Sequence, residues 1–282
     1  MKYPRPRQTA VFGTLLLFST LILTPAASLA EVSFTPRATL KFLSYEFTQT
    51  ARPGALPASI NGGDFPEVKF DVTFKILGIG GTFFSNGYYL DLAASRSADE
   101  EDSFEFEPMS FKETFKGDRS DTTITFGRKM LDNRAAVYIG YKTGKSQADG
   151  DQGQRLVFEE KGFFVGGNYS WPVLEASVVT LNVAYASLDG DLTEDVTNPG
   201  FVQITQDNGL PPLDINASSD ATGLSYSLGF ASRLSDTLSY SLAYEIKSYT
   251  FDNIEDSDPT VITSDEFEEK FKGLSLSLFY QF

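Results

Sequence analysis

The sequence predicts an all-β protein, a transmembrane, antiparallel, up-and-down β-barrel of about ten strands. Three observations point to this fold. Several segments alternate apolar residues with polar or small ones at a period of two, the period at which strand side chains change face. Short turns and long loops alternate between these segments. The first thirty residues follow the pattern of a secretory signal peptide, so we expect an exported chain.

Residues 1–30 contain the three parts of a signal peptide. The start is basic, with Lys2, Arg5 and Arg7. A mainly apolar stretch follows over residues 11–23, and small residues lead up to Ala30. This stretch is short for a membrane-spanning helix, which needs ~20 residues. We therefore expect cleavage after Ala30 and a mature barrel of residues 31–282.

The composition of the mature chain excludes several classes of partner. Loss of the three leading basic residues reduces 23 Lys and Arg to 20, against 38 acidic side chains, so the net charge becomes −18. Nucleic acid is excluded as a partner because phosphate binding needs clustered basic residues. The chain has no Cys, so neither disulfides nor a thiolate metal site can form.

Ten segments carry the strand pattern. They lie near residues 38–49, 67–84, 88–97, 121–130, 134–145, 157–170, 176–187, 222–234, 237–250 and 268–282. An even number agrees with bacterial single-chain barrels, and eight or twelve strands are the alternatives. The first segment is the least regular, because LKFLSYEF has apolar residues on both faces. GIGG at 78–81 offers an alternative turn within the second segment.

The residues opposite the apolar face indicate what each face contacts. In the last strands this second face is rich in small residues, such as Ser225, Ser227, Ser239, Ser241, Ser275 and Ser277. A soluble sheet would instead present a polar, solvated face. Small residues suit the crowded inside of a narrow barrel. We therefore expect the apolar face to contact lipid and the small residues to face the lumen.

The connections divide into two kinds. The short turns lie at 85–87, 131–133, 171–173 and 235–237, and Asn86-Gly87 is a strong hairpin signal. The long connections lie near 50–66, 97–120, 146–156, 188–220 and 251–267, and they hold many of the acidic residues. Short turns at one end and long loops at the other are typical of bacterial membrane barrels.

The last residues, LSLSLFYQF, carry a resemblance to a known family. They are similar to the C-terminal assembly signal of Gram-negative outer-membrane β-barrels. The resemblance implies an outer-membrane location, contact with outer-membrane lipid and lipopolysaccharide, and periplasmic placement of the short turns. It also implies recognition by the barrel-assembly machinery through Leu276, Leu278, Tyr280 and Phe282.

Charged residues within the predicted strands are candidates for the lumen. They are Lys69, Asp71, Lys75, Asp91, Lys142, Arg233, Glu245 and Lys247. Charges removed from water need partners of opposite sign. We therefore expect these side chains to form a charge network that lines the barrel.

An enzymatic role is not expected. Ten strands also resemble the omptin proteases, whose acid–base apparatus includes a histidine, and this chain contains none. The same absence argues against the barrel palmitoyltransferases, deacylases and phospholipases. Histidine is the side chain best suited to proton transfer near neutral pH.

One loop offers a candidate metal site. DGDLTED contains four carboxylates, at Asp189, Asp191, Glu194 and Asp195. Its spacing is not that of a complete calcium loop, and a solvated acidic loop is the alternative. A loop-bound divalent cation is therefore the only cofactor that the sequence suggests.

Two functions agree with these features. The first is a narrow, porin-like passive channel for small solutes, because the small lumen residues leave space. The alternative is a surface-recognition, adhesin-like or structural barrel with a plugged lumen, acting through its acidic extracellular loops. The number of strands does not distinguish these two functions. The interior of a barrel of ~8 strands is filled by side chains, wide open channels need ~16 strands, and ten lies between these values.

The signal peptide gives the first testable prediction. Protein isolated from outer membranes should begin at or near Glu31, because small residues end at the expected cleavage site. N-terminal sequencing of the membrane-inserted protein checks this. Retention of the apolar stretch at residues 11–23 would contradict it.

Overall fold

The computed structural model describes residues 32–50, 68–106, 111–197, 199–207, 214–256 and 266–282. The predicted signal peptide lies outside these residues. The strands are β1 (Ser33–Gln49), β2 (Val68–Ser85), β3 (Tyr88–Ser97), β4 (Glu100–Phe106), β5 (Phe111–Met130), β6 (Ala135–Gly150), β7 (Gln154–Leu174), β8 (Ser177–Val196), β9 (Ile215–Arg233), β10 (Leu238–Asp256) and β11 (Phe267–Tyr280). One helix, α1 (Pro199–Asp207), precedes β9, and no helix among the described residues is long and apolar enough to cross a membrane.

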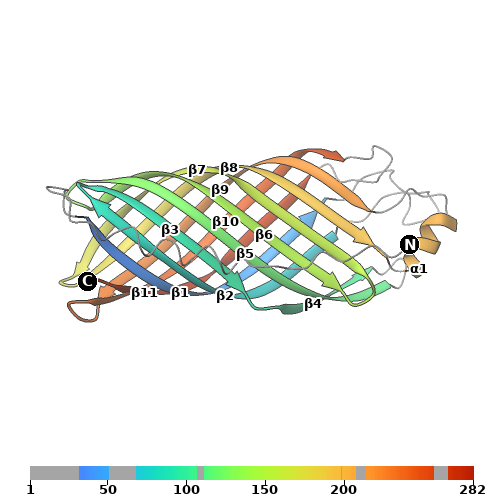
Figure 1. Cartoon of the computed structure of the whole chain (residues 1–282), viewed down its shortest axis with the longest axis horizontal. Helices are drawn as coiled ribbons and strands as arrows, with labels where there is room; N and C mark the ends of the chain where they lie inside the picture. Colours follow the sequence, from blue (N-terminus) through green and yellow to red (C-terminus); the bar gives the residue numbers. More distant parts are fainter. Residues whose placement is uncertain (1–31, 51–67, 107–110, 198, 208–213, 257–265) are drawn as a thin grey trace, which may run out of the picture.

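The strands close into a barrel (Figure 1). Strands that follow one another in the chain pair antiparallel, except β3 and β4; β3 pairs with β5 instead, and β1 pairs with β11. The short strand β4 continues the line of β3 along β5: β3 pairs with residues 120–128 and β4 with residues 111–117. The barrel therefore has ten strand lines, which confirms the predicted number and the up-and-down order.

The strands are longer than predicted at the end that carries the long loops. β5 begins at Phe111, β8 reaches Val196 and β10 reaches Asp256, so much of the predicted loop sequence is strand. The predicted loop at 146–156 is wrong, because β6 and β7 meet in a tight turn at residues 151–153. The alternative turn at 78–81 is also wrong, because GIGG continues β2.

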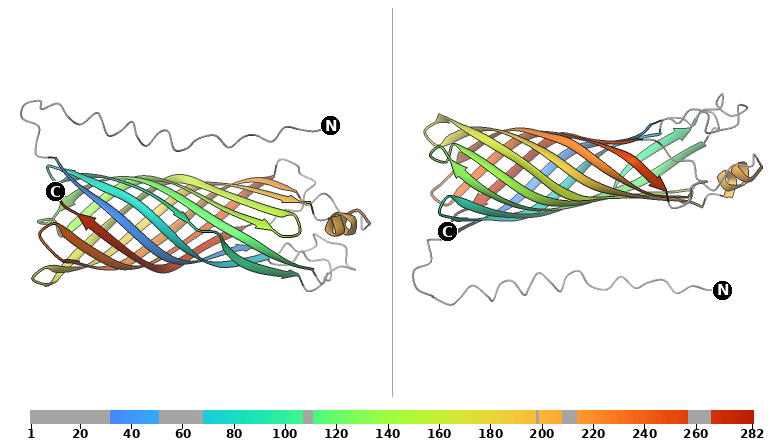
Figure 2. Two further views of the ribbon diagram at one scale, coloured as in Figure 1. Left: turned by 60° about the horizontal axis from the view of Figure 1, so that its bottom comes forward. Right: turned by 90° about the horizontal axis from the view of Figure 1, so that it is seen from above.

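The other end carries the short turns. Asn86 and Gly87 both have positive φ, 51° and 79°, as an Asn-Gly hairpin requires. The turns after β5, β7 and β9 lie at this end too, together with the C-terminus (Figure 1). Figure 2 shows the same arrangement from two further directions, with α1 at the opposite end. Short turns face the periplasm in bacterial membrane barrels. The end with the short turns is therefore the periplasmic end, and the end with α1 is the extracellular end.

On several strands the apolar face changes sides part-way along the barrel. On β1, Leu40 and Phe42 point outward, whereas Leu43, Tyr45 and Phe47 point inward and are at most 3% exposed. This switch explains why LKFLSYEF has apolar residues on both parities. Near the periplasmic end the apolar face points outward, as the predicted contact with lipid requires, and beyond the switch it packs inside the barrel.

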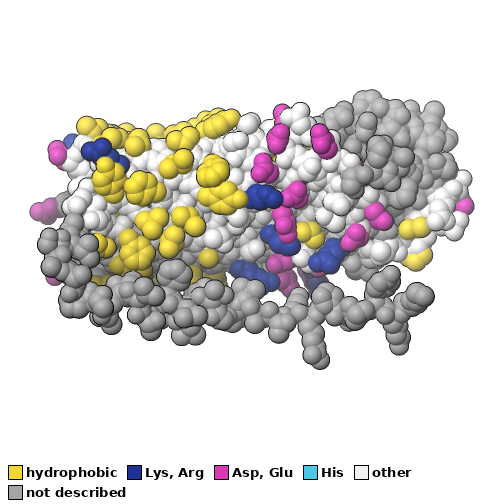
Figure 3. All heavy atoms as spheres, turned by 45° about the horizontal axis from the view of Figure 1, so that its top comes forward, with side chains coloured by type: hydrophobic (Ala, Val, Ile, Leu, Met, Phe, Trp, Pro, Cys, Tyr) yellow, Lys and Arg dark blue, Asp and Glu magenta, His cyan; other side chains and the backbone are white. Residues whose placement is uncertain are grey.

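The outward apolar residues on the periplasmic side of this switch form an apolar band around the periplasmic half of the barrel. On β7 the band runs from Phe163 to Trp171, and on β11 from Leu274 to Tyr280. Figure 3 shows hydrophobic side chains on this half and Lys, Arg, Asp and Glu beyond it. We call the parts of the strands beyond the band the extracellular extension.

Apolar side chains fill the inside of the extracellular extension. This cluster, called the extracellular core below, comprises Leu43, Tyr45, Phe47, Val72, Phe74, Ile76, Phe158, Ala186, Leu188, Leu192, Ile215, Ala217, Ala221, Tyr249, Phe251, Phe267 and Phe271. Full burial of one large apolar side chain is worth about 1.5–3 kcal/mol. The extension is therefore a packed β structure, with apolar side chains inside and charged pairs on its outer face.

The switch can be tested on one face of one strand. Leu242 and Thr250 both point outward on β10, but only Leu242 lies in the apolar band. Leu242→Arg should lower the free energy of unfolding by ~2–4 kcal/mol, if this level lies near the bilayer midplane. Thr250→Arg, the matched control, should have almost no effect because its side chain meets water. Urea unfolding in lipid vesicles measures both, and equal losses would contradict the position of the band.

Candidate functional site

The lumen contains a polar cavity beneath the extracellular core. Its volume is about 820 Å³. It reaches the periplasmic rim, because Asn133 of the β5–β6 turn belongs to its lining. At its inner end it meets Arg119, Tyr249 and Phe271, which lie at the base of the extracellular core. The cavity therefore extends through the membrane level but ends at the extracellular core.

An ion pair lies in the lower part of the cavity. Arg37 of β1 and Asp91 of β3 form a bidentate pair, in which Nη2 donates to Oδ2 at 2.8 Å. Thr82 of β2 donates to the same carboxylate at 2.6 Å. Asp91 thus lies on the lumen side, where its alternation placed it, and it holds three neighbouring strands together.

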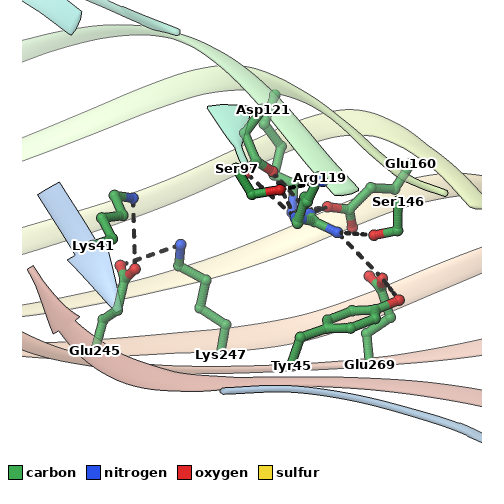
Figure 4. Close-up of polar contacts among 11 residues, drawn as sticks. Lys41, Tyr45, Ser97, Arg119, Asp121, Ser146, Glu160, Glu245, Lys247 and Glu269 are labelled. Atoms are coloured by element: carbon green, nitrogen blue, oxygen red, sulfur yellow. Dashed lines mark hydrogen bonds and ion pairs between the residues drawn. The ribbon is translucent and has the colours of Figure 1, made fainter. Parts of the chain in front are cut away.

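A second group of charges lies deeper. Glu245 of β10 is within 3.5 Å of Lys41 Nζ and 3.2 Å of Lys247 Nζ. All three side chains line the cavity. Figure 4 shows the two ammonium groups on either side of the carboxylate. One carboxylate is therefore shared between two cations.

A buried charge cluster forms the inner end of the cavity. We call it the Arg119 cluster; it consists of Arg119, Asp121, Glu160 and Glu269, which Figure 4 labels, together with Lys142. Arg119 is 3% exposed and donates to Glu160 at 2.5 Å, to Asp121 at 2.8 Å and to Ser146 Oγ at 2.7 Å. Lys142 Nζ lies 2.9 Å from Glu160.

The Arg119 cluster is joined directly to the extracellular core. Tyr45 donates its hydroxyl to Glu269 at 2.8 Å, and the Arg119 guanidinium lies 4.4 Å from the centre of the Phe271 ring. A cation over a ring face is stabilised by the ring's quadrupole. The close approach also requires Gly144, since a Cβ atom there would collide with Glu160 and Arg119. Ions and aromatic rings therefore close the lumen together.

The two buried glutamates have opposite protonation preferences. They lie beyond the apolar band, because the outward neighbours of Glu160 are the charged Glu159 and Lys161. Burial, and then the charge of Glu160, raises the pKa of Glu269. Burial opposes ionisation of Glu160 as well, but the charges of Lys142 and Arg119 overcome it and lower its pKa. The cluster therefore favours the protonated form of Glu269 beside the ionised form of Glu160.

The lumen prediction is wrong for three residues of β2. Lys69, Asp71 and Lys75 are exposed on the outer face, and Val72 and Phe74 point inward between them. The alternation was correct, but this part of β2 belongs to the extracellular extension, where the apolar face is inside. Lys69 pairs outside with Glu46 at 2.9 Å and Lys75 with Glu100 at 3.0 Å.

The other five predicted residues divide between lumen and rim. Asp91, Lys142, Glu245 and Lys247 line the cavity. Arg233 is a correction: it is the last residue of β9, and its side chain is exposed at the periplasmic rim.

The residues of the proposed cation loop do not converge. They belong to β8, where Asp189, Asp191 and Asp195 are exposed on the outer face and Glu194 has the opposite parity. Asp191 pairs with Lys161 at 3.2 Å, and Glu194 accepts a hydrogen bond from Gln154. Among the described residues no group of three or more acids could hold a metal ion.

The residues of the predicted assembly signal lie on the lipid face. Leu276, Leu278 and Tyr280 are outward on β11, within the apolar band. Phe282 is 90% exposed, and its ring lies 5.0 Å from that of Tyr280. Their recognition by the assembly machinery stays a prediction.

Sequence reasoning missed the centre of the Arg119 cluster. Arg119 was placed in a loop, although it has the parity of Asp121, Thr123 and Thr125, which line the cavity. That shared parity was the available signal. Glu269 lies inside a predicted strand and has the inward parity of Ser275 and Ser277, but this parity identifies neither its height along the barrel nor its partners.

Comparison with known structures agrees with this geometry. The outer membrane protease OmpT from Escherichia coli matches with a TM-score of 0.53 and 10% identity, over 91% of this chain and 100% of that one. This chain has the fold of a Gram-negative outer-membrane β-barrel. The fold supports an outer-membrane location for the barrel.

Other outer-membrane barrels match over similar lengths. OprG from Pseudomonas aeruginosa gives a TM-score of 0.35 at 9% identity, over 90% of this chain and 96% of that one. Ail from Yersinia pestis gives 0.29 at 12% identity, over 89% and 99%. The sequence matches no protein-family model and no curated protein.

The two glutamates of the Arg119 cluster should respond oppositely to amide substitution. Glu160→Gln leaves Arg119 and Lys142 without their main counter-charge, and should cost about 3–5 kcal/mol of unfolding free energy. Glu269→Gln keeps a neutral group of the same shape and should cost little.

The pH dependence distinguishes the two variants further. The contribution of Glu269 is fully present below its unfolded pKa and is lost as the pH rises through its raised folded pKa. Glu269→Gln should therefore be relatively more stable at alkaline than at acidic pH, compared with the wild type. Urea unfolding at both pH values measures this, and an equal loss in both variants would contradict the assignment.

Proposed function

We propose that this protein is an integral outer-membrane barrel with a closed lumen, which acts at the cell surface as a recognition or structural barrel. The extracellular core is the observation that carries the proposal. It favours the alternative function over the porin-like channel that the sequence placed first.

The packing of aromatic rings supports a closed lumen. Phe158, Phe251 and Phe267 come from three strands and are fully buried. The ring centres of Phe158 and Phe251 are 4.8 Å apart, and Phe47 lies 5.4 Å from Phe158 and 5.7 Å from Phe267. A solute could pass only by displacing these rings, and exposing one buried Phe side chain costs about 1.5–3 kcal/mol.

The outer face of the extracellular extension supports a role at the surface. It carries many charges, among them the pairs Lys145–Glu159 and Arg155–Asp149. Asp220 of β9 lies directly opposite Asp189 on β8 and Asp252 on β10. Like charges placed opposite each other destabilise a sheet. The negative potential of this face would attract cationic partners.

The proposed role is not enzymatic. The chain contains no histidine, and three buried charge-bearing groups of the lumen, Arg119, Glu160 and Glu269, lie beneath the extracellular core. OmpT is a protease, but an identity of 10% supports a shared fold and not a shared reaction.

A passive channel is the second candidate, and the polar cavity is the observation that favours it. The cavity crosses the membrane level and has charged and hydroxyl side chains. It would conduct only if the extracellular core opened.

Planar-bilayer recording separates the two functions. Wild-type protein should show no resolvable channels. The triple variant Phe158→Ala, Phe251→Ala and Phe267→Ala should show steps of conductance, because it removes three rings from the obstruction. Resolvable channels in the wild-type protein would contradict the closed lumen and support the passive channel instead.

A matched control uses aromatic residues of the outer face. Phe126→Ala, Phe163→Ala and Phe230→Ala remove three rings from the lipid side. This control should stay closed, which shows that conductance in the first variant does not come from general loosening of the barrel.

A further inference from the structure

The charge of the cavity is opposite in sign to that of the chain. The whole chain has a net charge of −15. Six cations line the cavity, Arg37, Lys41, Arg119, Lys129, Lys142 and Lys247, against three carboxylates, Asp91, Asp121 and Glu245. Glu160 lies behind this lining, in contact with Arg119 and Lys142, and Glu269 lies 3.5 Å from Arg119; one positive charge remains in excess even when both glutamates are counted as ionised. The cavity therefore keeps a positive excess inside an acidic protein.

Lys129 has a special position among these cations. It points inward near the periplasmic end of β5, and its ammonium lies 4.0 Å from the centre of the Phe84 ring. Arg37 and Lys41 are each paired with a carboxylate, whereas no ion pair of Lys129 occurs among the described residues. Lys129 thus offers a half-buried positive charge at the entrance.

The walls between the charges can bind hydroxyl groups. They carry hydroxyl and amide side chains, including Tyr89, Thr123, Thr125, Asn168, Ser225, Ser227 and Ser275. Hydroxyls and amides both donate and accept hydrogen bonds, as sugar hydroxyls do. The volume of about 820 Å³ lies within the range of ligand pockets, roughly 300–1,000 Å³.

We propose that the cavity is a binding site for a small, hydroxylated anion, such as a sugar phosphate, that enters from the periplasm. Lys129 binds the anionic group near the entrance, and the hydroxyl-rich walls bind the sugar. The extracellular core closes the far end, so the ligand enters and leaves on the same side. This site is distinct from the proposed surface role, which uses the other end of the barrel.

Calorimetry with the full barrel in lipid nanodiscs tests the site. Glucose 6-phosphate is the probe and glucose the neutral control. Glucose 6-phosphate should bind at least about tenfold more tightly, because only its phosphate can form a charge-assisted hydrogen bond with Lys129. Equal affinities, or no binding of glucose 6-phosphate, would overturn the proposal.

Neighbouring residues on β5 supply matched variants. Lys129→Gln should weaken the affinity for glucose 6-phosphate about tenfold, whereas Lys129→Arg, which keeps the positive charge, should retain most of the wild-type affinity. Arg128→Gln removes a charge at the same rim, but Arg128 points outward and lies 5.4 Å from the Tyr88 ring, so binding should not change. Equal losses in Lys129→Gln and Arg128→Gln would reduce the effect to general rim charge and overturn the assignment to Lys129.

These measurements are independent of the surface role. Channels in wild-type bilayers would overturn the closed lumen, yet the binding difference between glucose 6-phosphate and glucose would remain. Loss of that difference in a non-conducting barrel would overturn the binding site alone.

Discussion

The fixed alternation of strand side chains is the constraint on which this structure depends. Successive residues point to opposite faces, so a strand that leaves lipid for water must move its apolar residues from the outer face to the inner one. β1 does this between Phe42, which points outward, and Leu43, which points inward. Hydrophobic burial therefore holds the barrel in the membrane at one level and packs its interior at the next.

The Arg119 cluster lies inside the barrel at the boundary between the membrane half and the extracellular extension. In the membrane half the interior is polar, because the apolar residues are outside; in the extension the interior is apolar. Arg119 lies at the boundary and contacts both, through Glu160 on one side and the Phe271 ring on the other. A guanidinium is suited to this position because it forms directed ion pairs and also stacks on aromatic rings.

The sequence contains the period of each strand but not the solvent on either side. Strand number, the Asn86-Gly87 turn and the lipid face of the last strands could be predicted, because each depends on local pattern or turn chemistry. The face of Lys69, Asp71 and Lys75 could not, because VKFDVTFKI reads the same whether its apolar side meets lipid or a core. That choice depends on how far the barrel extends beyond the membrane, and this extent is a property of all the paired strands rather than of one segment.

The Arg119 cluster shows a second reason why sequence falls short. Arg119 of β5, Glu160 of β7 and Glu269 of β11 are far apart in the chain and come from non-adjacent strands. Only closure of the barrel brings them across the lumen into contact. Alternation assigns each to the inner face, but it gives no height along the barrel and no partner.

Strand number alone does not decide whether such a barrel is open. The same ten strands enclose a cavity where Ser225, Ser227 and Ser275 point inward, and a packed core where Phe158 and Phe251 do. The volume of the inward-facing side chains therefore determines whether the lumen is open at a given level. This volume changes along a single strand. β10 itself contributes Glu245 to the cavity and Phe251 to the core. One barrel can thus enclose a cavity at its periplasmic end and a packed core at its extracellular end, divided only by the side chains of its own strands.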